Sequence, residues 1–349
     1  MLPLKNGTNS HYSTKSLIGA VFLLVCIGVV ALERWGFFQW KLFPYSEGGG
    51  FKEYSAPEAI ASQGDHQRIS SPIPDLYIHK ITSSWHPPFY VASHEEGPPF
   101  VDGDMAQSTI LEQLDLWARC REDPSLLVVD VGGYLGDFGL RAAACGCRTV
   151  IFEVQPQMLR YIRASVMLNG FEDDRVRVVP RAIGEKEGEK VEFSQIGGST
   201  FQGTEKANLR GKVAGRFIAT TTTLDAAFPT ERIFFLKIDT EGNEPQVLQS
   251  AQRLLRDGRI THAVLEYTAW WSSRGDQHGL LPKLFSYHPR GLYALHRREG
   301  KLFGPVADNE AEKFYHNHVS RHLQTDIYAV FGQGQLPTAT GKWTGDVYA

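Results

Sequence analysis

At 349 residues, the chain is long enough for one α/β catalytic domain with further segments at its ends. It is 42% hydrophobic and 21% charged, as a globular protein is, and its formal charge of −3 argues against a nucleic-acid binder held by bulk positive charge. Four cysteines are few for a secreted disulfide scaffold.

The first predicted element is an uncharged apolar run, SLIGAVFLLVCIGVVAL, from Ser16 to Leu32. At ~1.5 Å per residue its length comes near the hydrocarbon thickness of a bilayer. We expect a transmembrane signal anchor over residues 16–35, after a cytosolic tail (1–15) and before a Gly-, Ser- and Pro-rich stem (36–75). A cleavable signal peptide and a hydrophobic helix of the fold are the alternatives. The anchor predicts a type II single-pass protein of the endomembrane system, with the side occupied by the catalytic domain left open.

A lead-in segment is expected over residues 76–122. Its last part, DMAQSTILEQLDLWARC, carries apolar residues at helical spacing. We expect one helix there that packs on the main sheet.

Strand and helix patterns alternate through the main domain, residues 123–335, which leaves a C-terminal tail at 336–349. Short β-branched runs such as SLLVVDV and TVIFEV are separated by amphipathic stretches, including EPQVLQSAQRLLRDG, which we expect to be one helix. A polar, Gly-rich insertion occupies residues 185–216, and the last strands alternate around Glu299-Gly300. This pattern predicts a Rossmann-like, doubly wound, mostly parallel α/β sheet with an antiparallel C-terminal hairpin.

The CGC sequence of Cys145 and Cys147 has the residue types of a metal or redox pair. The spacing is not CxxC, and no second pair or nearby histidine accompanies it. We expect small buried residues between a helix and a strand.

The stretch VVDVGGYLGDFGL predicts a ligand-binding turn. A strand ends at Asp130, and Gly132, Gly133 and Gly136 permit a tight turn before a helix whose N–H groups face the ligand. A dinucleotide fingerprint requires glycine where this chain has Tyr134, so a nicotinamide cofactor is not expected.

The pattern D-x-G-x-x-x-G resembles motif I of class I S-adenosylmethionine-dependent methyltransferases. The next strand ends at Glu153, 23 residues after Asp130, where the resemblance implies an acid that binds the two ribose hydroxyls. The alternative is that Glu153 is only an acid at a helix start.

Eight segments in order, among them DVGGYLG, VVPRAIGEKEG, TTTLD, LKIDTEGNEPQVLQSAQRLL and HAVLEY, resemble the FkbM family of methyltransferases over residues 126–268. Val154 and Ser165 depart from the usual proline and asparagine. The resemblance implies methyl transfer from S-adenosylmethionine, most often to an oxygen of a sugar or another hydroxylated small molecule. The implied cofactor residues are Asp130, Gly132, Gly133, Gly136, Glu153 and Ala182.

Four charged residues are the candidates for catalysis: Asp239, Glu241, Glu266 and Lys237. An alcohol needs a base or a metal to become a nucleophile, and Asp239 follows a strand at the expected crevice. Lys237 is expected mainly to neutralise these acids. Asp239 and Glu266 are the ligands to consider if the enzyme uses Mg²⁺. Glu244 precedes Pro245, so a function and a helix-start role fit it equally.

We therefore expect a methyltransferase that acts on a small-molecule or glycan acceptor, contacts the membrane through its N-terminal helix and does not bind nucleic acid. A catalytically degenerate ligand-binding protein and an N- or carboxyl-methyltransferase are the competing hypotheses.

Overall fold

The computed structural model describes residues 66–69, 75–94, 105–196, 199–202, 215–296 and 299–344. All of them belong to one compact unit, Ala61–Ala349. The expected cytosolic tail, the signal anchor and most of the stem lie outside the described residues. Among the helices that are described, none is both long and apolar enough to cross a membrane.

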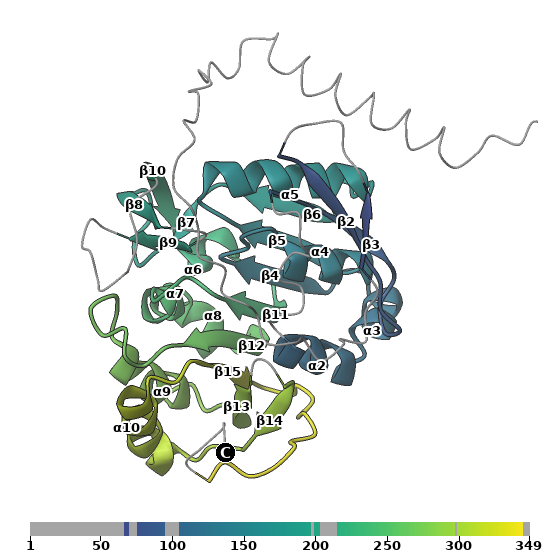
Figure 1. The fold of residues 1–349 in the computed structure, drawn as a ribbon. Helices are drawn as coiled ribbons and strands as arrows, with labels where there is room; N and C mark the ends of the chain where they lie inside the picture. Colours follow the sequence, from purple (N-terminus) through teal and green to yellow (C-terminus); the bar gives the residue numbers. More distant parts are fainter. Residues whose placement is uncertain are drawn as a thin grey trace, which may run out of the picture. The chain divides into compact units, whose positions relative to one another are not determined.

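The main sheet of the described chain has eight strands in the order β14-β13-β15-β12-β11-β4-β5-β6 (Figure 1). Strands β6, β5, β4, β11 and β12 are mutually parallel, whereas β15 is antiparallel to both β12 and β13, and β14 is antiparallel to β13. This arrangement confirms the predicted fold class and the C-terminal hairpin. The strand bounds are β4 Leu127–Val131, β5 Arg148–Phe152, β6 Val176–Val179, β11 Ile233–Ile238, β12 Ile260–Tyr267, β13 Gly291–His296, β14 Lys301–Phe303 and β15 Thr325–Val330.

The strand order reverses between β4 and β11. From β4 the chain proceeds outward through β5 and β6, and it then returns to β11, which pairs with the other side of β4. In doubly wound sheets, ligands bind outside the carboxyl ends of the strands at such a reversal. The residues that follow β4 and β11 therefore lie at the expected binding crevice.

Helices cover both faces of the sheet. As a consequence, β4 and β11 are buried along their whole length. One face packs against α4 and α5, and the other against α6 to α10. The helix bounds are α4 Asp137–Ala144, α5 Pro156–Leu168, α6 Leu224–Ala227, α7 Glu244–Ser250, α8 Gln252–Arg256, α9 Gln277–Phe285 and α10 Ala311–Arg321.

The lead-in segment is part of the folded unit. Strands β1 (His66–Ile69), β2 (Tyr77–Ile81) and β3 (Phe89–Ser93) form an antiparallel sheet, and β1 lies within the expected stem. The Asn169 side chain, after α5, accepts a hydrogen bond from Tyr90 N and donates one to Tyr90 O, at 2.8 and 2.7 Å. Two hydrogen bonds from one side chain fix β3 against α5.

Two helices that were predicted as continuous are each divided. The lead-in helix becomes α2 (Met105–Gln113) and α3 (Leu116–Glu122), because Asp115 adopts a left-handed conformation and its side chain caps Ala118 N. The helix after Glu244 divides into α7 and α8 at Ala251. Just before that break, the Ser250 hydroxyl donates to Val247 O, a back-bond of the kind that bends helices.

The polar insertion contributes β8 and β9 to a second, smaller sheet, whose strand order is β7-β10-β8-β9. Its strands are β7 Ala182–Ile183, β8 Lys190–Ile196, β9 Ser199–Gln202 and β10 Gly215–Thr222. The predicted C-terminal tail also packs on the domain in its described part: Trp343 is buried and its ring lies 5.1 Å from that of Phe314.

Cys145 and Cys147 are buried between α4 and β5, as predicted, but the prediction missed the disulfide that Cys147 forms with Cys120 of α3. Cys145 is a buried free thiol, as expected of a small core residue. The local CGC spacing gave no indication of a partner 27 residues earlier in the chain. The disulfide ties the lead-in segment to the start of β5.

Candidate functional site

The loop between β4 and α4 lies directly against the residues that follow β11. Gly132 has φ 81°, and a Cβ there would lie 1.7 Å from Asp239 O. A Cβ at Gly133 would lie 2.4 Å from Ile151 Cγ2, and Gly136 has φ 78°. Glycine suits Gly132 and Gly136 because their backbone is left-handed, and it suits Gly132 and Gly133 because a side chain would collide with neighbouring atoms.

Glu153 follows β5 and is buried beneath this loop. Its carboxylate accepts hydrogen bonds from the backbone N–H groups of Tyr134, Val154 and Gln155, each at 2.7 Å. Burial raises the pKa of Glu153 to about 7, although the three N–H donors favour the charged form. A carboxylate has about four acceptor positions, so Glu153 can accept one more donor on Oε2.

Asp130, Lys237 and Asp239 form a chain of charges across the strand reversal. Lys237 Nζ lies 3.3 Å from Asp130 Oδ1 and 3.7 Å from Asp239 Oδ2, and it donates to Gly132 O at 3.3 Å. Burial raises the pKa of Asp130, and Lys237 opposes that shift. The Asp239 side chain is 22% exposed, whereas that of Asp130 is fully buried. Of the two acids that Lys237 pairs with, Asp239 is therefore the one a ligand can reach.

Glu241 points toward Arg274. It adopts φ 56°, its carboxylate lies 3.8 Å from Arg274 Nη1, and its backbone carbonyl accepts a hydrogen bond from the same nitrogen at 3.0 Å. The Glu241 charge is thus compensated by an arginine from the loop after β12.

Glu244 has a clear structural role at the start of α7. Its Oε1 accepts hydrogen bonds from Thr240 N, Thr240 Oγ1 and Gly242 N at 2.8, 3.0 and 3.2 Å. Burial raises the pKa of Glu244 to about 7. These bonds fold the chain after Asp239 into a compact turn.

Glu266 lies beside Asp239 at the sheet edge. Because Ile238 pairs with Leu265, the next residues along the two strands, Asp239 and Glu266, are neighbours. Glu266 is buried and accepts a hydrogen bond from Gln324 Nε2. It is also the register partner of buried Asp326 on β15.

Ala182 lies in β7, on the side of the site where Glu153 is found. It is buried in a cluster with Phe193 and Ala219, against which Val154 packs. Ala182 and Glu153 are therefore linked through the segment that follows β5.

The structure brings the predicted residues together in two groups. Asp130, Lys237, Asp239 and Glu266 lie along β4, β11 and β12, and Gly132, Gly133, Gly136, Glu153 and Ala182 lie around the loop and toward β7. Within the described residues there is no group of three or more His, Cys, Asp or Glu side chains arranged for a metal ion.

Sequence reasoning missed Arg274 and Gln324, which hold two of the predicted acids. A single arginine or glutamine in a polar loop carries no recognisable pattern. For Arg274, the only available signal was its position shortly after the strand that ends with Glu266.

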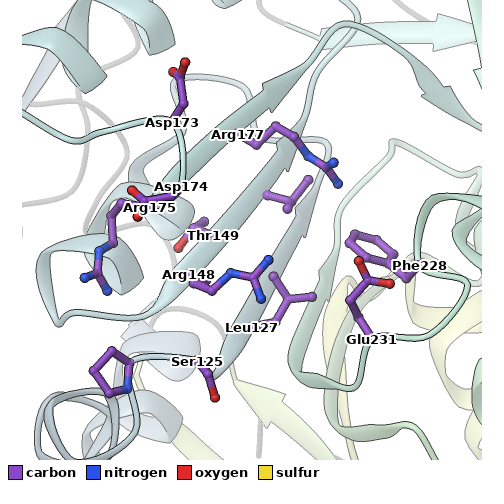
Figure 2. A pocket seen from close by; sticks show the side chains of 12 residues that line it. Ser125, Leu127, Arg148, Thr149, Asp173, Asp174, Arg175, Arg177, Phe228 and Glu231 are labelled. Carbon is purple, nitrogen blue, oxygen red and sulfur yellow. The ribbon is translucent and has the colours of Figure 1, made fainter.

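A cavity of about 600 Å³ lies elsewhere, at the amino ends of β4, β5 and β6 (Figure 2). Arg148 and Arg177 are among the residues that line it, with Phe228 and Glu231 from the segment before β11. The candidate site is at the carboxyl ends of the same strands, so this cavity is not part of it.

The residues present fit S-adenosylmethionine. The glycine loop is a cradle in which side chains would collide, and Glu153 has an acceptor position for a ribose hydroxyl. α4 begins directly after this loop, at Asp137. A turn with three glycines before a helix, with an acid after the next strand, suits an amino-acid moiety and a ribose.

This fold and site define an S-adenosylmethionine-dependent methyltransferase. Residues 130–303 match the model of the methyltransferase FkbM domain. The chain belongs to the FkbM family of methyltransferases.

No curated protein matches this chain. Among solved structures, it is similar to the METTL16 MTase domain, with 13% identity, a TM-score of 0.37 and coverage of 69% of this chain and 72% of that one. It is also similar to an O-methyltransferase from Bacillus cereus in complex with SAH, with 13% identity, a TM-score of 0.35 and coverage of 68% and 93%.

Proposed function

We propose that this enzyme transfers the methyl group of S-adenosylmethionine to a hydroxyl oxygen of a neutral small molecule or glycan. The supporting observation is the position of Asp239. It is paired with Lys237, lies at the strand reversal and remains partly exposed, whereas Glu244 and Glu266 are buried and the more exposed Glu241 is held by Arg274. Asp239 is thus the acid best placed to meet an acceptor.

The proposed roles follow from what each group contacts. The bound cofactor supplies a methyl group on a sulfonium, which is a good leaving group, so the protein must align the acceptor and take up its proton. Asp239 accepts that proton from the hydroxyl. Lys237 pairs with the Asp239 carboxylate at 3.7 Å and fixes it relative to the glycine loop through Gly132 O.

Charge favours a neutral acceptor over a polyanion. Three carboxylates, those of Asp239, Glu241 and Glu266, lie near the crevice, and Lys237 already pairs with both Asp130 and Asp239. A nucleic acid would bring phosphates toward this group, which like-charge repulsion opposes. This is consistent with the expectation that the protein does not bind nucleic acid.

The test is release of S-adenosylhomocysteine across a panel of sugars, polyols, amines and carboxylic acids, with wild-type protein and Asp239→Asn. We expect turnover with a hydroxyl acceptor and a loss of about 100-fold or more in kcat for the variant, as is typical when a general base is removed. Turnover only with amines or acids would instead identify an N- or carboxyl-methyltransferase. Tight cofactor binding without turnover on any acceptor would support a degenerate binding protein.

A chelator arm of the same assay tests the Mg²⁺ hypothesis. A metal held by Asp239 and Glu266 predicts activity that EDTA abolishes and Mg²⁺ restores. Activity unaffected by EDTA would leave the proton transfer to Asp239 alone.

We further propose that the catalytic domain is on the luminal side of an endomembrane, attached through residues 16–35. The Cys120–Cys147 disulfide supports this side, since disulfides persist in oxidising compartments and are rare in the cytosol. Proteolysis of sealed vesicles should leave the catalytic domain intact until detergent is added. Digestion without detergent would place the domain in the cytosol.

A further inference from the structure

The side chain of Arg274 joins two segments at the carboxyl edge of the sheet. The first segment, which we name the acid turn, comprises residues 239–244 after β11. The second, the tryptophan loop, comprises residues 268–276 after β12. Arg274 belongs to the tryptophan loop and reaches the acid turn at Glu241, both at the backbone carbonyl and at the carboxylate.

The acid turn is shaped to receive this arginine. A Cβ on Gly242 would lie 2.7 Å from both Cβ and Cδ of Arg274, so the side-chain stem occupies the space that glycine leaves. Two further hydrogen bonds flank this contact: Gln277, the first residue of α9, donates Nε2 to Gly242 O at 2.9 Å, and Gln246 of α7 donates Nε2 to Arg274 O at 3.2 Å. The tryptophan loop therefore rests directly on the turn that carries Asp239.

The guanidinium of Arg274 also lies over an aromatic ring. Arg274 Cζ lies 3.8 Å from the ring centroid of Trp271, which is a close cation–π contact. Trp271 in turn meets Trp270 edge to face, with centroids 5.5 Å apart. Trp270 is 38% exposed, although tryptophan is usually well buried. A partly exposed indole at this edge offers a surface on which the C–H face of an acceptor ring can stack.

Three carboxylates act on the charge of Arg274. Burial lowers the pKa of Arg274, and the carboxylates of Glu241, Glu266 and Glu244 oppose that shift. An arginine is suited to this position because its planar group bonds to oxygen at the edge while stacking on a ring. A lysine retains the charge but not the planar stack.

We propose that Arg274 is a positioning residue for the methyl acceptor: it fixes the acid turn, and hence Asp239, relative to the exposed Trp270 platform. Arg274 acts through Glu241 on one side and Trp271 on the other. The acceptor is then bound between the ring of Trp270 and the carboxylate of Asp239. The guanidinium of Arg274 sets the distance between these two groups. This inference rests on the proposed function, because it assumes that Asp239 meets the acceptor.

The experiment compares Arg274→Ala and Arg274→Lys with a matched control, Arg259→Ala. Arg259 also joins loops through backbone carbonyls, since its Nη1 donates to Phe228 O at 2.9 Å and to Glu231 O at 3.0 Å. It lies at the opposite edge of the sheet, just before β12. A general loss of stability should thus affect both alanine variants alike.

The first readout needs no acceptor. Amide hydrogen exchange is measured at Thr240 and Gly242, whose N–H groups bond to Glu244. Arg274→Ala should accelerate exchange there by about tenfold, the effect of losing a hydrogen bond to a charged group, and Arg259→Ala should leave it unchanged. Equal exchange in wild type and Arg274→Ala would overturn the proposal.

The second readout separates positioning from folding. With an acceptor from the panel, Arg274→Ala should raise the acceptor KM by about tenfold while the Kd for S-adenosylhomocysteine stays unchanged. Arg274→Lys should recover part of that loss, because the charge beside Glu241 is retained. An unchanged acceptor KM, or equal changes in Arg274→Ala and Arg259→Ala, would contradict the proposal. If wild type turns over no acceptor, the proposed function fails, and the exchange rates alone decide whether Arg274 fixes the acid turn.

Discussion

Replacing Glu153 with glutamine tests the cofactor site through its pH dependence. Burial raises the pKa of Glu153 to about 7, and the ionised form is the better acceptor for a ribose hydroxyl. With that pKa, the ionised fraction is about 0.1 at pH 6 and about 0.9 at pH 8. The affinity for S-adenosylhomocysteine should therefore increase by about tenfold between pH 6 and pH 8 if only the ionised form binds.

Isothermal titration calorimetry with S-adenosylhomocysteine at pH 6, 7 and 8 measures this change. Glu153→Gln should bind more weakly at pH 8 and show a flat profile. Glu244→Gln is the matched control, since burial raises the pKa of Glu244 to about 7 as well, yet its side chain bonds within the acid turn. A wild-type Kd that is the same at pH 6 and pH 8, or a pH dependence that persists in Glu153→Gln, would refute the assignment.

The same shift has a consequence for folding whose sign is opposite to the usual carboxylate case. The native pKa of about 7 lies above the ordinary value of 4.5, so between these values the native state binds more protons than the unfolded state. The contribution of Glu153 to stability is fully present below about pH 4.5 and is lost as the pH rises through about 7. Between about pH 4.5 and a pH above 7, the free energy of urea unfolding should fall by an amount on the order of 3 kcal/mol because of this group. This pH-dependent fall should be absent in Glu153→Gln.

Two further predictions concern stability, measured by urea unfolding. Gly132→Ala should lower the free energy of unfolding by about 2–4 kcal/mol, because strain at φ 81° adds to the collision with Asp239 O. Gly170→Ala, at φ 64° with open space around it, should lower it by only about 1 kcal/mol. Equal costs would argue against the close approach at Gly132. Lys237→Met should cost about 3–5 kcal/mol by leaving Asp130 buried without its cation, and adding Asp130→Asn should recover much of it. A cost below about 1 kcal/mol for Lys237→Met would contradict that pairing.

The sheet and the glycine loop were predictable because their signals are local. Apart from Asp130, a run such as Leu127–Val131 is apolar and rich in β-branched residues, which favours a strand buried on both sides, and the strand–glycine–helix order places a ligand at its end. The helix breaks at Asp115 and Ala251 were not predictable in the same way. Each depends on a hydrogen bond that competes with helix continuation in a sequence whose periodicity is unbroken.

The residues of the candidate site likewise differ in whether a local sequence signal predicts them. Asp239 and Glu153 could be predicted as candidates because each follows a strand in a characteristic motif. The partners of the acids were not recognisable: Arg274 reaches Glu241 over 33 residues, and Gln324 reaches Glu266 over 58. Contacts of that kind are set by loop packing between neighbouring strands, for which a single sequence has no periodic signal.

The bond between Cys120 and Cys147 shows that the recognisable family region and the folding unit do not coincide. The FkbM match begins at residue 130, yet Cys120 precedes it, as do Leu111 and Leu116, whose side chains complete one of the hydrophobic cores. A fragment cut at the family boundary would keep its motifs and lose both a cross-link and part of its interior. A folded transplant of the catalytic sheet would therefore require residues 75–122 to be moved with it.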